Sequence, residues 1–156
     1  MLEQREVFTM HPIAARRPRT RVAAPRWLSV TFLLRLSLAA IFFWFGMLKL
    51  AGVSPAVELL RHSIPFLAVP PYIELLGLAE IVIAVGLVIE RLANQAATLM
   101  ILHLFCTLSI AIISPTLIFA PAFPVLTMDG EFLAKNFVLI TAGLVVMSHR
   151  ESTTRL

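Results

Sequence analysis

The stretch LLRLSLAAIFFWFGMLKL (residues 33–50) is the part of the sequence that decides the fold. It is apolar along its whole length except for Arg35, Ser37 and Lys49. An α-helix rises about 1.5 Å per residue, so a helix that crosses a bilayer needs roughly 20 mostly apolar residues. Extended back to residue 27, the stretch predicts a transmembrane helix over 27–50 that carries two cations.

The rest of the chain has the same character. Of its 156 residues, 59% are hydrophobic and 14% are charged, and the mean hydropathy is +0.90. A soluble domain of this length cannot hide so much apolar surface. Further apolar runs at 72–89, 94–113 and 132–148 predict three more spans. We therefore predict an all-α membrane protein, a four-transmembrane-helix bundle over residues 27–149.

The connections between the predicted spans differ in kind. Ser54 followed by Pro55 is typical of a helix start, and it predicts a short helix over 56–64 that lies on the outer surface of the membrane or dips into it. Residues 114–128 contain three prolines and are predicted to form an irregular outer loop. Asp129-Gly130 is expected to turn the chain into the fourth span.

Charge distribution predicts the orientation. Six arginines fall within residues 1–26, and the remaining loops on that side contain Arg91, Arg150 and Arg155. Lys49, Arg61 and Lys135 fall on the opposite side. Because Lys and Arg collect on the cytoplasmic side, both termini are predicted to be cytoplasmic. Residues 1–26 are interpreted as a disordered basic tail that sets topology rather than binding nucleic acid, and 150–156 as a C-terminal tail.

Three ionisable residues fall at similar predicted depths in three spans. Counted from the inner helix ends, Arg35 lies roughly 12 Å in, Glu80 roughly 15 Å and His103 roughly 14 Å. Ionisable groups at membrane depth usually pair or mark a functional path. We expect a buried polar layer with an Arg35–Glu80 ion pair and His103 nearby. This layer is either a structural staple or a site for a polar-headed lipophilic molecule such as a quinone, with Glu80 or His103 handling protons.

A second polar layer is predicted near the outer surface. It comprises Lys49, Glu74, Lys135 and Asn136. One interpretation is that the long side chains simply extend to the membrane surface. The other is that they line the mouth of a path for an anionic or oxidised small molecule.

Metal and covalent chemistry find little support in the sequence. Met100, His103 and Cys106 share one helical stripe and are weak candidates for a Cu(I) site, although such residues in an apolar helix usually pack. The single cysteine excludes exchange chemistry that needs a cysteine pair within the chain. No nucleotide-binding loop or hydrolase triad order is present, so no catalytic residue is predicted.

Three motifs resemble one family of membrane proteins. The stretch at 33–50 and LLGLAEIVIAVGLVI (residues 75–89) are similar to the first and second spans of DoxX-like and DoxD-like proteins. The stretch FPVLTMDGEFLAKNFVLITAGLVV (residues 123–146) resembles the branch that contains reactive-chlorine-resistance inner-membrane proteins. That branch has an acid where this chain has Asn136, so any role of the acid does not carry over.

The resemblance implies a four-helix bundle in a bacterial inner membrane, within a family that includes subunits of a thiosulfate:quinone oxidoreductase. We therefore predict a quinone-linked or oxidative-stress-linked redox membrane subunit, accessory to an oxidoreductase if it belongs to an enzyme. Its surroundings are the lipid bilayer, and its partner is a soluble redox enzyme or a second copy. No cofactor is established, although quinone is compatible. The alternatives are a small-molecule or ion transporter and a scaffold that recruits a soluble enzyme through residues 1–26.

Overall fold

The structure is a computed structural model that describes residues 29–154, with side chains described for residues 29–148. Among the described residues there is no strand, only an isolated bridge between Phe119 and Leu126. The helices, in order, are α1 (Val30–Leu50), α2 (Pro55–Ser63), the short 3-10 helix η2 (Pro65–Leu67), α3 (Pro70–Val88), α4 (Ala93–Leu108), α5 (Ile110–Ile113), α6 (Pro115–Ile118) and α7 (Met128–Thr154). The predicted all-α class is confirmed.

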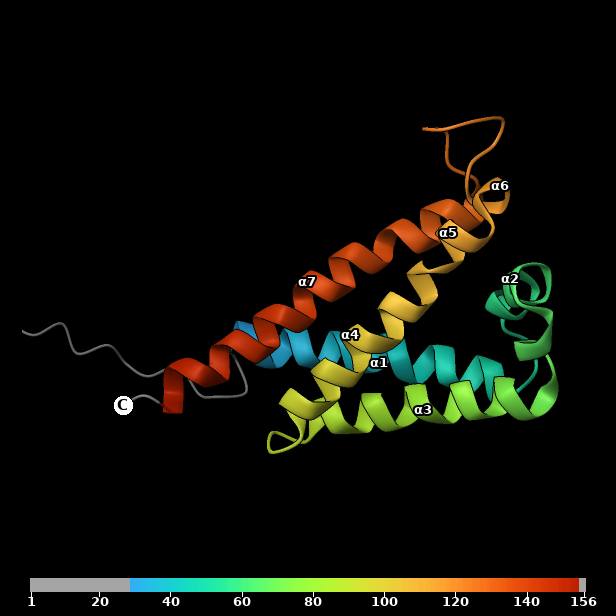
Figure 1. Cartoon of the computed structure of the whole chain (residues 1–156). Coiled ribbons are helices and arrows are strands. Elements are labelled where there is room, and N and C mark those ends of the chain that lie inside the picture. The colour runs from blue at the N-terminus through green and yellow to red at the C-terminus, as the bar shows by residue number, and fades with distance from the viewer. Residues whose placement is uncertain (1–28, 155–156) are drawn as a thin grey trace, which may run out of the picture.

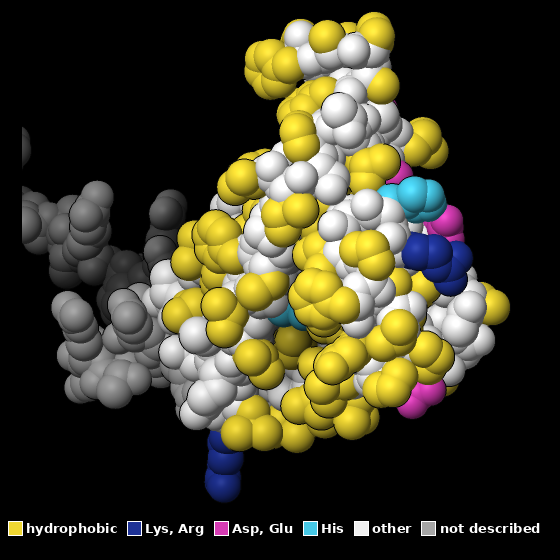
Figure 2. Space-filling view, turned by 45° about the vertical axis from the view of Figure 1, so that its right-hand side comes forward, with side chains coloured by type: hydrophobic (Ala, Val, Ile, Leu, Met, Phe, Trp, Pro, Cys, Tyr) yellow, Lys and Arg dark blue, Asp and Glu magenta, His cyan; other side chains and the backbone are white. Residues whose placement is uncertain are grey.

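Four segments are long and apolar enough to cross a membrane. They are Val30–Leu50, Pro70–Val88, Ala93–Ile113 and Met128–Ser148. In the most apolar 18 residues of each segment, only 22–39% are buried inside the bundle. Most of the apolar side chains therefore face outward, as Figure 2 shows. Such a surface is stable in hydrocarbon and not in water. The chain is therefore a multi-pass membrane protein.

The four spans form two pairs (Figure 1). Helix α1 packs along α3, and α4 packs along α7. The pairs meet near the α3–α4 turn and diverge towards the opposite end, where α2 lies. We call these two ends the turn end and the α2 end. The divergence leaves a wedge between the pairs at the α2 end, and this wedge holds the candidate site.

Small residues set the close approach within the first pair. A Cβ added to Gly46 would lie 2.6 Å from the carbonyl oxygen of Gly77, and one added to Gly77 would lie 2.9 Å from the carbonyl oxygen of Gly46. Both distances are too short for a real Cβ. Small residues at a crossing let helix backbones come together inside a membrane. The two glycines therefore fix where α1 and α3 cross.

The predicted surface helix is present with nearly the predicted bounds. Helix α2 starts at Pro55, the first helical position, where a missing N–H has no cost. Ser54 precedes it with an extended backbone, but its hydroxyl oxygen accepts no cap hydrogen bond from the first helical turn. Glu58 and Arg61 form an exposed ion pair one turn apart, with 2.7 Å between Oε2 and Nη1. The opposite face, which includes Leu59, turns inward.

The predicted start of the fourth span was wrong. Helix α7 begins at Met128, so Asp129 and Gly130 belong to its first turn rather than to a preceding turn. The Thr127 hydroxyl oxygen accepts a hydrogen bond from the N–H of Gly130 at 3.0 Å, which satisfies a free donor at the helix start. Acidic side chains in a first helical turn are also favoured by the helix dipole. The helix continues to Thr154, into the predicted C-terminal tail.

The third span is also less regular than predicted. Helix α4 ends at Leu108, and the short helix α5 follows after Ser109. The Ser109 hydroxyl donates to the carbonyl of Cys106 at 2.6 Å, which competes with the regular helical bonds at this point. The predicted basic tail over 1–26 lies outside the described residues, and the orientation of the bundle in the membrane stays a prediction.

Candidate functional site

A pocket occupies the wedge at the α2 end of the bundle. It has a volume of about 130 Å³, close to the roughly 150 Å³ of a cavity that takes up one benzene ring. Figure 2 shows a hollow rimmed by hydrophobic side chains, with a histidine side chain inside it. The apolar lining includes Phe42, Phe45, Leu59, Leu60, Ile64, Phe132 and Leu139, and the polar lining is Lys49, Glu80, His103, Thr107 and Asn136.

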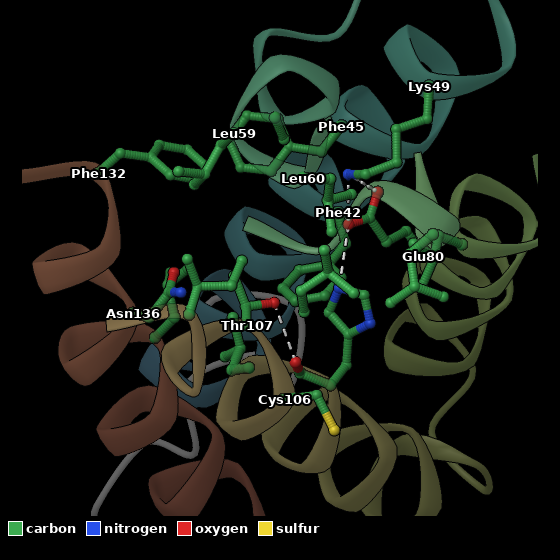
Figure 3. A pocket seen from close by; sticks show the side chains of 18 residues that line it. Phe42, Phe45, Lys49, Leu59, Leu60, Glu80, Cys106, Thr107, Phe132 and Asn136 are labelled. Atoms are coloured by element: carbon green, nitrogen blue, oxygen red, sulfur yellow. Dashed lines mark hydrogen bonds and ion pairs between the residues drawn. The ribbon is translucent and has the colours of Figure 1, made fainter. Parts of the chain in front are cut away.

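A charged cluster forms part of the pocket wall (Figure 3). The Nζ of Lys49 donates to both carboxylate oxygens of Glu80, at 2.7 and 2.8 Å. The Nε2 of His103 lies 3.1 Å from Oε1 of the same carboxylate. Only 7% of Lys49 and 4% of Glu80 is exposed. The cluster is therefore an ion pair with a histidine attached, brought together by α1, α3 and α4.

Helix geometry explains why Lys49 and Glu80 meet. Side chains on an α-helix lean towards its N-terminus. Because α1 and α3 run in opposite directions, Lys49 leans away from the α2 end and Glu80 leans towards it. Gly77 lies opposite Lys49, with only 3.0 Å between a Cβ placed on the glycine and the lysine Cβ. The glycine crossing therefore brings the two charges within contact distance.

The predicted ion pair between Arg35 and Glu80 was wrong. Arg35 donates from Nε to the carbonyl oxygen of Leu87 at 2.8 Å and from Nη2 to that of Val88 at 2.9 Å. These carbonyls lie at the C-terminal end of α3, two helical turns from Glu80. A cation is favoured there because the last carbonyls of a helix lack helical partners. Arg35 and Glu80 were counted to similar depths from the sequence, but their side chains do not lie in one layer.

His103 has a defined orientation in the cluster. An ionised carboxylate only accepts hydrogen bonds, so the 3.1 Å contact assigns the ring proton to Nε2 when Glu80 is ionised. Its ring packs edge-on against Phe42, with 6.0 Å between centroids. With Nε2 protonated, Nδ1 is an acceptor in the neutral ring and a donor in the charged ring. The site therefore places an imidazole ring beside a buried carboxylate that is paired with a lysine.

The structure divides the predicted outer layer. Lys49 and Asn136 are buried and line the pocket. Glu74 and Lys135 are exposed on the outside of the bundle and do not line it. The four residues therefore do not form a common mouth, and the one interior pair among them lies on opposite walls, from α1 and α7.

The weak metal candidates are not brought to one point. Met100 is fully buried in the core, where its Cε lies 2.6 Å from a Cβ placed on Gly143. Cys106 lines the pocket and is exposed, and His103 bonds to Glu80. Within the described residues, no group of three or more His, Cys, Asp or Glu side chains is placed to hold a metal ion.

Two features of the site were missed by sequence reasoning. One is the Lys49–Glu80 pair, although a signal was present: Gly46-x-x-Lys49 and Gly77-x-x-Glu80 repeat the same spacing of glycine and charge on consecutive spans. The other is the contribution of α2, whose Leu59 and Leu60 line the pocket. The packing of α2 against the pocket is a contact between residues far apart in the sequence, and no local sequence pattern predicts it.

The chain was compared with models of protein families, with curated proteins and with solved structures, and none of the three comparisons gave a match.

Proposed function

We propose that this membrane protein binds a lipophilic molecule with a polar head, of the quinone type, as the membrane subunit of a DoxX-like redox system. The pocket has aromatic walls, from Phe42, Phe45 and Phe132. Aromatic side chains pack favourably against a flat ring. The small volume admits one ring, and the lipid-facing surroundings suit a long apolar tail.

The observation that carries this proposal is the Lys49–Glu80–His103 cluster in the pocket wall. A buried ion pair is costly to desolvate and contributes little to stability by itself. Ionisable residues inside a membrane are by default candidates for function. Here the cluster faces a pocket rather than a packed helix interface, which favours ligand binding over a purely structural staple.

The chemistry of a quinone also matches the cluster. Reduction of a quinone to a quinol takes two electrons and two protons. His103 and Glu80 supply groups that can pass a proton to a ring oxygen. The electrons then come from a partner, as expected for a subunit that works with a soluble redox enzyme. The bacterial inner membrane and the cytoplasmic termini belong to the same proposal.

The test is mass spectrometry of the lipophilic molecules that copurify with gently extracted protein. Wild type is compared with Glu80→Gln and with the control Glu74→Gln, at equal amounts of folded protein. We expect stoichiometric quinone in wild type and in the control, and a loss in Glu80→Gln. If all three proteins carry no more quinone than the copurified bulk lipid does, the proposal is contradicted and the cluster is a structural staple.

A further inference from the structure

Asn136 carries a polar atom with no partner. The side chain extends from α7 into the lining of the pocket, opposite the charged cluster (Figure 3). Only 4% of the residue is exposed, and its Nδ2 is buried without a hydrogen-bond partner. A buried donor that makes no bond is destabilising and needs an explanation, such as a ligand or water that completes it.

The comparison with a second such atom shows why Asn136 is different. Among the described side chains, the other buried polar atom without a partner is Oδ1 of Asn94. Asn94 lies in the first turn of α4 at the turn end, is only partly buried and does not line the pocket. Asn136 lies within a span, where water is scarce and unsatisfied groups cost most. Only Asn136 therefore points to a ligand.

The other polar groups of the pocket narrow the chemistry of that ligand. Both carboxylate oxygens of Glu80 are already engaged by Lys49, and Oε1 also by His103. The Thr107 hydroxyl donates to the carbonyl oxygen of His103. An ammonium group has three N–H bonds, and Glu80 accounts for two of those of Lys49. N–H donors without a partner therefore remain on Asn136 and on Lys49, from opposite walls of the pocket.

We propose that Asn136 selects the ligand by donating a hydrogen bond to a carbonyl-type acceptor on its ring. The inference rests on the proposed function and adds the ligand class: an uncharged lipophilic ring that bears hydrogen-bond acceptors. Lys49 and Asn136 then bind the ring from opposite walls of the pocket, with the aromatic residues between them. A site that offers donors discriminates against an analogue without acceptors, because its N–H groups then stay unpaired.

The experiment compares two probes that share one tail, a decyl-substituted 1,4-benzoquinone and decylbenzene. Each competes with a radiolabelled short-chain quinone for full-length protein in nanodiscs. The variants are Asn136→Leu, which keeps the size and removes the donor, Asn136→Gln, which keeps an amide, and the exposed neighbour Lys135→Leu as control. In wild type and the control, the benzoquinone is expected to bind about tenfold more tightly than decylbenzene.

In Asn136→Leu we expect the preference to fall to about threefold, because Lys49 still donates from the other wall. Thermal stability is expected to rise, because an unpaired donor is removed. Asn136→Gln is expected to recover part of the preference. If Asn136→Leu keeps the preference, or fails to fold, the inference is overturned while the proposed function stands. If neither probe displaces the radiolabelled quinone from the wild-type protein, the proposed function itself fails.

Discussion

The two ends of the bundle use the same four spans in different ways. At the turn end, Leu87, Ala97 and Met100 are completely buried, and the helix pairs pack through small and apolar side chains. At the α2 end the pairs diverge, and the space holds a charged cluster, an unpaired amide and a pocket. Lipid tails are as apolar as leucine, so packing rather than hydrophobicity holds the turn end together. At the α2 end the helix pairs pack less closely, and the interior between them is polar.

The largest expected effect comes from removing one charge at the α2 end. In Glu80→Leu, Lys49 stays buried without a counter-charge, and we expect the free energy of unfolding to fall by about 3–5 kcal/mol. The measurement is unfolding by sodium dodecyl sulfate in mixed micelles, followed by circular dichroism. The double variant Lys49→Met/Glu80→Leu serves as control.

This control separates stability from function, because replacing both members of a buried ion pair by apolar residues is often neutral. We expect the double variant to unfold much like wild type and to copurify no quinone. If Glu80→Leu alone unfolds like wild type, the ion pair at 2.7 Å does not exist in the membrane.

A second comparison concerns one glycine from each end. In Gly46→Ala the new Cβ meets the backbone of Gly77, which cannot move without separating α1 from α3. In Gly143→Ala at the turn end, the new Cβ meets the flexible end of the Met100 side chain. We expect a loss of about 1–3 kcal/mol for Gly46→Ala and less for Gly143→Ala.

The same unfolding assay measures both variants, and quinone content gives a second measurement. Separating α1 from α3 moves Lys49 away from Glu80, so only Gly46→Ala is expected to lose ligand. Equal losses of stability and ligand in the two variants would contradict the assignment of the site to the α2 end.

Arg35 gives a smaller effect, confined to the turn end. Replacement by Gln removes a charged partner of the last α3 carbonyls, and we expect a cost of about 1 kcal/mol in the unfolding assay. Ligand content should stay at the wild-type level, because Arg35 bonds to Leu87 and Val88 rather than to Glu80. Loss of ligand in Arg35→Gln would instead support the sequence prediction that Arg35 belongs to one polar layer with Glu80 and His103.

Much of the fold could be predicted from the sequence because a bilayer imposes a length and a composition on each span. The four spans and the short helix after Ser54 follow from local pattern alone. The start of α7 did not, because its cap is Thr127, whose hydroxyl also donates to the carbonyl oxygen of Leu117 in α6. A cap of this kind depends on a contact with another helix, so the hydropathy pattern does not predict where the helix starts.

The site was predicted in part, for a geometric reason. Glu80 and His103 were correctly expected to lie together, but their third partner is Lys49. Depths counted along a helix place Cα atoms, whereas a lysine side chain extends several ångströms towards the N-terminus of its helix. The counting therefore assigned Lys49 to the surface and Arg35 to the cluster.

The smallest expected effect concerns the exposed charges Glu74 and Lys135. Neither residue lines the pocket, so neutralising both, in Glu74→Gln/Lys135→Gln, should change the free energy of unfolding by no more than about 0.5 kcal/mol. Quinone content should also stay unchanged, because the Lys49–Glu80–His103 cluster is complete without them. A clear loss of bound quinone in this variant would show that surface charge guides the ligand into the wedge, and would favour the path-lining interpretation of these residues over simple exposure to the membrane surface.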